Sequence, residues 1–398
     1  MRSILAGAAV LAGGTLLIAG CSSGGSSSSA AAGGTAAAGG SAPVTVRLGY
    51  LANITHAPAL IGVKNGYFAK DLGSAGTLKT TVYTSGTQET TAILSGQLDA
   101  AFVGPNPAIN AWSKSSGQAI KIVSGVATGG ASVVVKPAIT SAAQLKGQSL
   151  ASPSLGNTQD VAVRYWLKQQ GLATSATGGA SVVVKPTVTS AAQLKGQSLA
   201  TPSLGNTQDV AVRYWLKQQG LATSTTGGGD VAIKPTAPNS AAVLEFKSGQ
   251  IAGASEPSPY DVEMVQEGGK VLLSEPGVTT LLVVTQSFLA AHPDVVADLL
   301  KANLDALGYI KSDPSGAEEA ANAELAAYTG KPLKAKVLDP AFKEITFTAD
   351  PDAASLTKDA QEATAVGLLK AVNLSGIFDL GPLNSILTAT EQPTVSAG

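Results

Sequence analysis

The chain has few of the residues that build covalent or metal-bound sites. One of its 398 residues is a cysteine, Cys21, and two are histidines, His56 and His292. A single cysteine excludes an internal disulfide and a cysteine-based zinc site. A histidine-dependent metal centre or catalytic triad would have to use one of the two histidines. We therefore expect neither a metal ion nor a cofactor.

The chain also lacks an excess of charge of either sign. Its 26 basic and 27 acidic residues nearly cancel, whereas a nucleic-acid-binding protein needs a basic patch or stripe. We therefore expect no nucleic acid as partner. Arginine is especially scarce, being present only as Arg2, Arg47, Arg164 and Arg213. An anion site in this chain would rest mainly on neutral hydrogen-bond donors.

The sequence contains none of the common catalytic motifs. It has no Walker A loop, no GxGxxG after a strand, no GxSxG elbow and no HExxH, and its acidic residues form no paired pattern. We therefore predict a protein that is not an enzyme.

The N-terminus has the pattern of an export signal. Arg2 precedes a short apolar run from Ile4 to Ile18, which is too short to span a bilayer as a helix. The run ends in Leu-Ile-Ala-Gly-Cys21, which resembles the bacterial lipobox. We predict a signal peptide over 1–20 and a lipid on Cys21 that anchors the chain to the outer face of the cell membrane. Residues 21–43 are mostly Ser, Gly and Ala, which predicts a flexible tether.

From Val44 onward, segments with strand and helix patterns alternate, which predicts a parallel α/β sheet. Strands are expected at 44–50, 80–83, 99–103 and 120–124, with helices at 56–68, 87–95 and 107–115 between them. After Gly125 the alternation continues and indicates a second α/β lobe. The C-terminal third has helical spacing at 287–311, 317–328 and 353–371.

The sequence contains one internal repeat. Residues 128–176 recur as 177–225, and the copies differ only at the pairs Ala138/Thr187, Ile139/Val188, Ser152/Thr201 and Ala176/Thr225. Two near-identical copies indicate a tandem duplication rather than a solenoid, whose repeats are diverged and more numerous. Each copy is typical of one strand–strand–helix unit. We expect one copy to fill the usual place in the fold, and the other to form an added layer at a sheet edge or an extruded loop.

Polar, glycine-containing turns join several predicted strands to the helices that follow them. They are 52–56, 84–88, 104–107 and 154–158, the last repeated at 203–207. In a parallel sheet these turns lie together at the carboxyl ends of the strands, where ligands bind. Helix N-termini there offer free N–H groups and a partial positive charge to an anion. Helix capping alone would also explain Ser, Thr, Asn and Gly at these places.

Several stretches resemble one protein family. LGYLANITHAPALIGVKNGYF from Leu48, SGTQETTAILSGQLDAAFVGPNPAINAW from Ser85, FLAAHPDVVADLLKANLDALGYI from Phe288 and FDLGPLNSIL from Phe378 are similar to substrate-binding proteins of bacterial ABC importers for nitrate, taurine and aliphatic sulfonates. The resemblance implies a two-lobed, type II periplasmic-binding-protein-like α/β fold. Lobe one would comprise 44–125 and 278–398, and lobe two 126–277, with crossings near 125–135 and 278–284. It also implies a monomer that closes around a small anion and delivers it to a permease driven by an ATPase.

Carried over by position, the resemblance implies ligand contacts in every turn. They are Tyr50, Asn53 and Thr55; Ser85, Gly86 and Thr87; Gly104 and Asn106; and Ser154, Asn157 and Thr158 or their duplicates Ser203, Asn206 and Thr207. We add two candidates: His56, which could equally be a structural partner of the helix start, and Glu256, in Ser-Glu256-Pro. The repeat departs from the family and falls on the contact loop of lobe two.

Three other functions remain open from the sequence. One is an enzyme of the same fold, similar to pyrimidine-precursor synthases, although these use a cysteine-rich motif and a catalytic histidine. Another is a receptor for a neutral or cationic ligand, such as a thiamine-pyrimidine precursor. The last is a duplicated relic that binds nothing.

Overall fold

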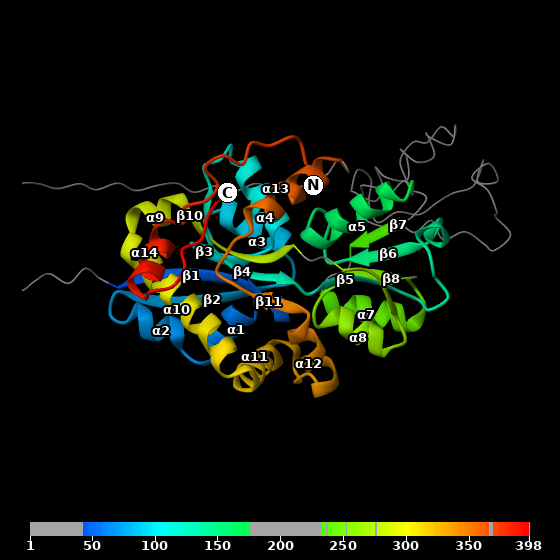
Figure 1. Ribbon diagram of the computed structural model, residues 1–398, viewed down its shortest axis with the longest axis horizontal. Coiled ribbons are helices and arrows are strands. Elements are labelled where there is room, and N and C mark those ends of the chain that lie inside the picture. Colours follow the sequence, from blue (N-terminus) through cyan, green and yellow to red (C-terminus); the bar gives the residue numbers. More distant parts are fainter. Residues whose placement is uncertain are drawn as a thin grey trace, which may run out of the picture. The chain divides into compact units, whose positions relative to one another are not determined.

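The computed structural model describes residues 43–172, 174, 232–235, 238–251, 253–274, 277–365 and 369–397 (Figure 1). The predicted signal peptide, nearly all of the tether and the second copy of the repeat lie outside the described residues. So do the candidates Cys21, Ser203, Asn206 and Thr207. None of the helices in the described ranges is both long and apolar enough to cross a membrane.

Within the described residues, six strands form a first sheet in the order β11-β4-β10-β3-β1-β2. Their bounds are β1 Val44–Leu51, β2 Gly76–Tyr83, β3 Ala100–Val103, β4 Ile120–Gly129, β10 Val278–Thr285 and β11 Ile345–Phe347. β1 pairs in parallel with β2 and β3, whereas β10 runs antiparallel between β3 and β4, and β11 pairs antiparallel with β4. The sheet is therefore mixed rather than parallel as predicted, because β10 and β11 come from the part of the chain that returns from lobe two. β3 and most of β10 are buried and almost continuously apolar, as expected for central strands covered on both faces.

Helices cover both faces of the first sheet (Figure 1). The core on one face includes residues of α1 Ala57–Lys64, α2 Tyr67–Leu72, α10 Pro293–Ser312, α11 Pro314–Thr329, α12 Ala335–Lys343 and α14 Gly381–Ala389. The core on the other face includes residues of α3 Gly86–Leu94, α4 Pro105–Lys114 and α13 Ala353–Ala365. The short helices η1 Ile54–His56 and α9 Gln286–Ala291 complete this part, which we call lobe one.

Three predicted helices differ in the structure. The helix expected over 56–68 is divided, because Gly66 takes a left-handed conformation (φ 71°) between α1 and α2. The helix expected over 287–311 is divided at His292, where Pro293 starts α10. The helix expected over 353–371 is too long, since α13 ends at Ala365 and residues 369–372 are not helical.

Within the described residues, five strands form a second sheet in the order β7-β6-β8-β5-β9. Their bounds are β5 Ala131–Val135, β6 Ser149–Ser152, β7 Ala232–Pro235, β8 Gly253–Pro257 and β9 Lys270–Ser274. α5 Thr158–Gln169 contributes to the core on one face, and α7 Asn239–Ser248 and α8 Tyr260–Gln266 contribute to that on the other. With η2 Ala142–Leu145, these elements form what we call lobe two.

The first copy of the repeat is built into lobe two. It supplies β5, β6 and α5, while β7 follows the duplicated region and pairs with β6 at the sheet edge. The additional residues of the chain therefore enter between α5 and an edge strand. An insertion there interrupts no interior strand pairing, and a longer connection costs little additional loop-closure entropy.

The chain passes from the first sheet to the second at two adjacent glycines, Gly129 and Gly130. Both have positive φ (73° and 72°), and both are closely packed against lobe one. A β-carbon on Gly129 would lie 2.6 Å from the carbonyl oxygen of Glu344, and one on Gly130 would lie 2.3 Å from Cγ1 of Ile345. Only glycine satisfies both the backbone conformation and the packing at this crossing.

Candidate functional site

A small cavity of about 20 Å³ lies where the loops of the two lobes meet. This is room for about one or two water molecules. Its walls come from both lobes and consist of Leu51, Asn53, Thr55, His56, Thr84, Ser85, Gly86, Gly104, Pro107, Pro153, Asn157, Thr158, Gln159, Asn239, Pro257 and Thr279. Eight of the residues proposed from the sequence are in this set: Asn53, Thr55, His56, Ser85, Gly86, Gly104, Asn157 and Thr158.

Helix N-termini from both lobes border the cavity. The lining residues include the first or capping residues of α3, α4, α5 and α7, and two residues of η1. The first turn of a helix has N–H groups without an intrahelical acceptor and carries a partial positive charge. Among the described residues that line the cavity there is no lysine or arginine. The arrangement therefore favours an anion through neutral donors.

In the turn 52–56, the side chains of Asn53 and Thr55 are held by consecutive hydrogen bonds. The hydroxyl of Thr280 on β10 donates to Oγ1 of Thr55 (3.2 Å), which donates to Oδ1 of Asn53 (2.7 Å). Asn53 and Thr55 are both buried. Because the amide oxygen of Asn53 accepts this bond, its NH₂ group is the part of the amide that remains for a ligand.

His56 is neutral in this setting. It is buried, and its Nδ1 accepts a 3.3 Å hydrogen bond from the backbone N–H of Leu51. Burial lowers the pKa of His56 to about 3. The ring proton is therefore assigned to Nε2, and the ring serves both as a structural acceptor and as part of the cavity wall.

The hydroxyl of Thr158 is a buried polar group without a hydrogen-bond partner among the described residues. It lies opposite Gly104, where a β-carbon would come within 2.7 Å of its Oγ1. A buried hydroxyl without a partner is costly, so its position in the cavity wall suits a ligand oxygen.

Asp160 fixes the loop that carries the residues of lobe two. Its carboxylate accepts hydrogen bonds from Ser152 Oγ (2.9 Å), the Gly156 N–H (3.0 Å) and Arg164 Nε (2.8 Å). Asp160 and Arg164 are fully buried. Sequence reasoning did not identify this network, although acidic and basic residues four apart on a helix are a usable signal.

Thr87 and Ser154 lie beside the cavity rather than in its wall. Their hydroxyl oxygens are 2.9 Å apart, so they join the start of α3 to the loop of lobe two. Asn106, in the first turn of α4, is buried but does not line the cavity, and its Oδ1 has no partner among the described residues.

The structure places Tyr50 and Glu256 away from the cavity. The hydroxyl of Tyr50 is 2.8 Å from that of Tyr328, and burial together with this contact raises the pKa of Tyr50. Glu256 is fully buried, and neither of its carboxylate oxygens has a partner among the described residues. Burial, followed by the neighbouring Asp261 and Glu245, raises the pKa of Glu256. Pro257, one residue further along β8, lines the cavity instead.

Several wall residues were not found from the sequence. Asn239 follows Pro238 at the start of α7, a helix-start signal that could have been used. Thr279 lies in the crossing expected at 278–284, but no motif in the sequence marks its side chain as part of the cavity wall.

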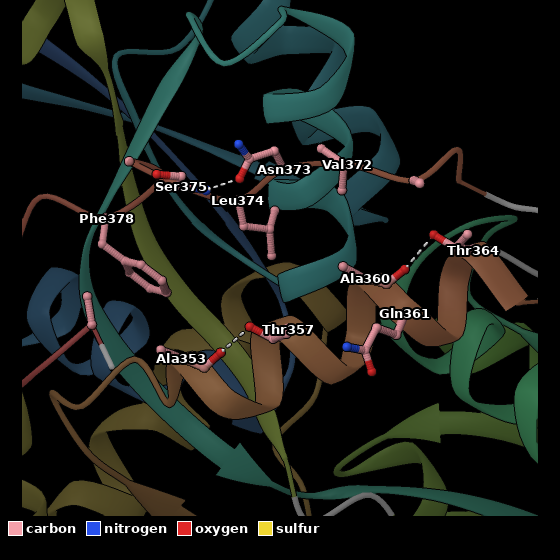
Figure 2. Close-up of a pocket in the computed structure, with 13 residues that line it drawn as sticks. Ala353, Thr357, Ala360, Gln361, Thr364, Val372, Asn373, Leu374, Ser375 and Phe378 are labelled. Atoms are coloured by element: carbon pink, nitrogen blue, oxygen red, sulfur yellow. Dashed lines mark hydrogen bonds between the residues drawn. The ribbon is translucent and has the colours of Figure 1, made fainter.

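A larger hollow of about 810 Å³ lies between α13 and residues 371–378 (Figure 2). Its lining has no charged side chain among the described residues. Thr357 and Thr364 donate to carbonyls of their own helix, and Asn373 accepts from the N–H of Ser375 (Figure 2). We assign no site to it.

Two α/β lobes with a polar cavity between them define the periplasmic-binding-protein class of folds. The chain belongs to the NMT1-like family, whose model matches residues 39–194 and again 182–326. The two matches overlap within the second copy of the repeat, as expected if one family unit is present twice. No curated protein matches the sequence.

Solved structures of low sequence identity share the fold. The periplasmic nitrate-binding protein NrtA from Synechocystis has 14% identity and a TM-score of 0.63, covering 88% of this chain and 90% of its own. The alkanesulfonate-binding protein SsuA from Xanthomonas axonopodis has 15% identity and a TM-score of 0.57, covering 85% and 99%. The aliphatic sulphonate-binding protein SsuA from Escherichia coli has 16% identity and a TM-score of 0.54, covering 84% and 97%.

Proposed function

We propose that this protein is the extracytoplasmic solute receptor of an ABC importer and binds a small anion, such as an aliphatic sulfonate, taurine or nitrate, between its lobes. The observation that carries the proposal is the cavity bordered by helix N-termini of both lobes, with the unpartnered hydroxyl of Thr158 in its wall. A ligand that bonds to donors of both lobes stabilises the closed form over the open one. The sulfonate- and nitrate-binding proteins of the same fold support this class of ligand.

In this proposal the protein is a monomer and has no catalytic role. Its closed form passes the anion to a permease that is driven by an ATPase. The lipobox-like sequence before Cys21 supports a lipid anchor, which holds the receptor at the outer face of the cell membrane. A tether of residues 21–43 then keeps the receptor at a high effective concentration near its permease.

A neutral heteroaromatic ligand, such as a thiamine-pyrimidine precursor, is the second candidate. It is favoured by the absence of lysine and arginine among the described residues that line the cavity. Neutral donors can bind carbonyl and ring-nitrogen acceptors as well as the oxygens of an anion.

Thermal unfolding with a panel of ligands separates the two candidates. A ligand at 100 times its dissociation constant stabilises the protein by about 2.7 kcal/mol. We expect sulfonates or nitrate to raise Tm and a neutral pyrimidine to have no effect. The reverse pattern would favour the second candidate.

Thr158→Val tests the site itself. A hydrogen bond to a charged group contributes about 1.5–3 kcal/mol. This variant should therefore fold normally but lose most of the rise in Tm that the anion causes. The control is Thr357→Val on α13, whose hydroxyl bonds to Ala353 of its own helix. Its shift should equal that of the wild type.

A further inference from the structure

A groove of about 870 Å³ opens onto the anion cavity. It lies between α7 and α8 of lobe two and α11 and α12 of lobe one (Figure 1). The groove and the cavity share Leu51, Asn53, Thr84 and Asn239 as lining residues. The cavity has room only for a small charged group. Any larger part of a ligand bound there has to extend past the shared residues into the groove.

The walls of the groove suit an apolar chain. Leu244 on α7 is 66% exposed and Tyr328 on α11 is 44% exposed, and they belong to opposite lobes. They are two of only five large apolar side chains that are exposed among the described residues. Two such side chains in one groove form an apolar surface, and burying it against a ligand is favourable in free energy. Tyr328 is held in place by its contact with the buried Tyr50.

The groove also carries a positive charge just before and at the start of α12. Lys331, Lys334 and Lys336 line it, are exposed, and form no ion pair with any carboxylate of the described residues. On the opposite side Lys247 and Glu267 neutralise each other at 2.8 Å. Glu263 is the acidic lining residue left to oppose the three lysines. The net charge of this lip is therefore complementary to a negative group.

We propose that the ligand is an elongated organic anion with a negative group at each end. One negative group lies in the cavity among the helix N-termini, and the apolar chain lies between Leu244 and Tyr328. The second negative group faces the three lysines before and at the start of α12. This assignment rests on the proposed function, because the first group requires the anion cavity.

Calorimetric titrations of the protein from Pro43 onward with three probes test the proposal. The probes are methanesulfonate, octanesulfonate, and the straight-chain disulfonate of the same length with one group at each end. Each CH₂ group removed from water contributes about 0.8 kcal/mol, so octanesulfonate should bind at least about tenfold more tightly than methanesulfonate. The disulfonate should bind about threefold more tightly again at low salt, and this last gain should vanish at high salt.

Two variants outside the anion cavity assign these gains to the groove. Leu244→Ser should weaken octanesulfonate binding roughly fivefold and leave methanesulfonate unchanged. The matched control is Leu94→Ser, which alters another exposed leucine (40%) that does not line the groove. The double variant Lys334→Gln/Lys336→Gln should weaken only the disulfonate.

The outcomes separate this inference from the proposed function. If none of the probes and no other small anion binds, the proposed function fails. If methanesulfonate binds while octanesulfonate and the disulfonate bind no more tightly, the anion site stands and the elongated ligand is wrong. If Leu244→Ser lowered the affinity for all three probes equally, the proposal of an elongated ligand would also be wrong.

Discussion

Gly104 of lobe one and Thr158 of lobe two face each other so closely that a β-carbon on residue 104 would lie 2.7 Å from the threonine Oγ1. Real β-carbon contacts are essentially never this short. The absence of a side chain at Gly104 is therefore what allows the two walls of the cavity to meet.

Gly104→Ala should weaken anion binding without preventing folding. The added methyl group has to push the lobes apart or move the Thr158 hydroxyl, and overpacking of this kind costs about 1–3 kcal/mol. Calorimetry should show a rise in Kd of roughly 5- to 150-fold. Gly308→Ala on α10 is the control, since the added carbon has no atom within 4 Å apart from the glycine itself, its chain neighbours and the nearby backbone of its own helix. Unchanged affinity in Gly104→Ala would mean that the lobes do not close on this contact.

Asp160→Ala should strongly destabilise the protein. Asp160 is the buried partner of Arg164, and removing one member of a buried ion pair costs about 3–5 kcal/mol. The duplication supplies a matched control, Asp209→Ala, at the equivalent position of the second copy. Because the first copy forms β5, β6 and α5 of lobe two, Tm measured by differential scanning calorimetry should fall for Asp160→Ala and not for Asp209→Ala. Equal falls for both variants would contradict that assignment.

Strands β1 to β4 of the first sheet were predicted from the alternation of strand and helix patterns, whereas β11 was not predicted. The turns of the site were predicted for a separate physical reason. Parallel strands end at the same edge, so the turns after β1, β2, β3 and β6 meet without any knowledge of side-chain packing. The alternation of side chains along a strand was harder to assign. Pro257 lines the cavity while Glu256 does not, and Leu51 lines it while the Tyr50 hydroxyl contacts Tyr328. A one-residue error in such a turn exchanges a wall residue for a core residue.

The pKa of His56 predicts loss of stability in acid. Burial lowers this pKa to about 3, so the folded state binds the proton less well than the unfolded state, whose pKa is about 6.5. The contribution of neutral His56 to the free energy of unfolding is fully present above about pH 6.5 and is lost as pH falls towards 3. Between about pH 6.5 and pH 5 it should cost about 2 kcal/mol of unfolding free energy.

Comparing variants in urea at each pH isolates the contribution of this histidine. His56→Asn keeps an acceptor near Leu51 but cannot gain a proton, so its unfolding free energy should depend less steeply on pH. The matched control is His292→Gln, which leaves His56 in place. The same slope in His56→Asn as in the wild type would show that His56 is not the titrating group.

The raised pKa of Glu256 predicts the opposite dependence of folding stability on pH. Burial and the nearby Asp261 and Glu245 raise the pKa of Glu256, so its contribution is favourable below its unfolded pKa and is lost as pH rises. Glu256→Gln removes this penalty and should raise Tm relative to the wild type at about pH 8, by an amount that shrinks towards about pH 5. The matched control is Glu319→Gln, at an exposed position of α11. A gain independent of pH would contradict the argument.

A crystal structure of the protein with the tightest-binding anion of the panel tests the central claim most directly. The account predicts one anion between the lobes, with an oxygen within hydrogen-bonding distance of Thr158 Oγ1 and others facing His56 Nε2 and the N-termini of α3 and α5. An anion bound elsewhere, or bound to only one lobe, would contradict it.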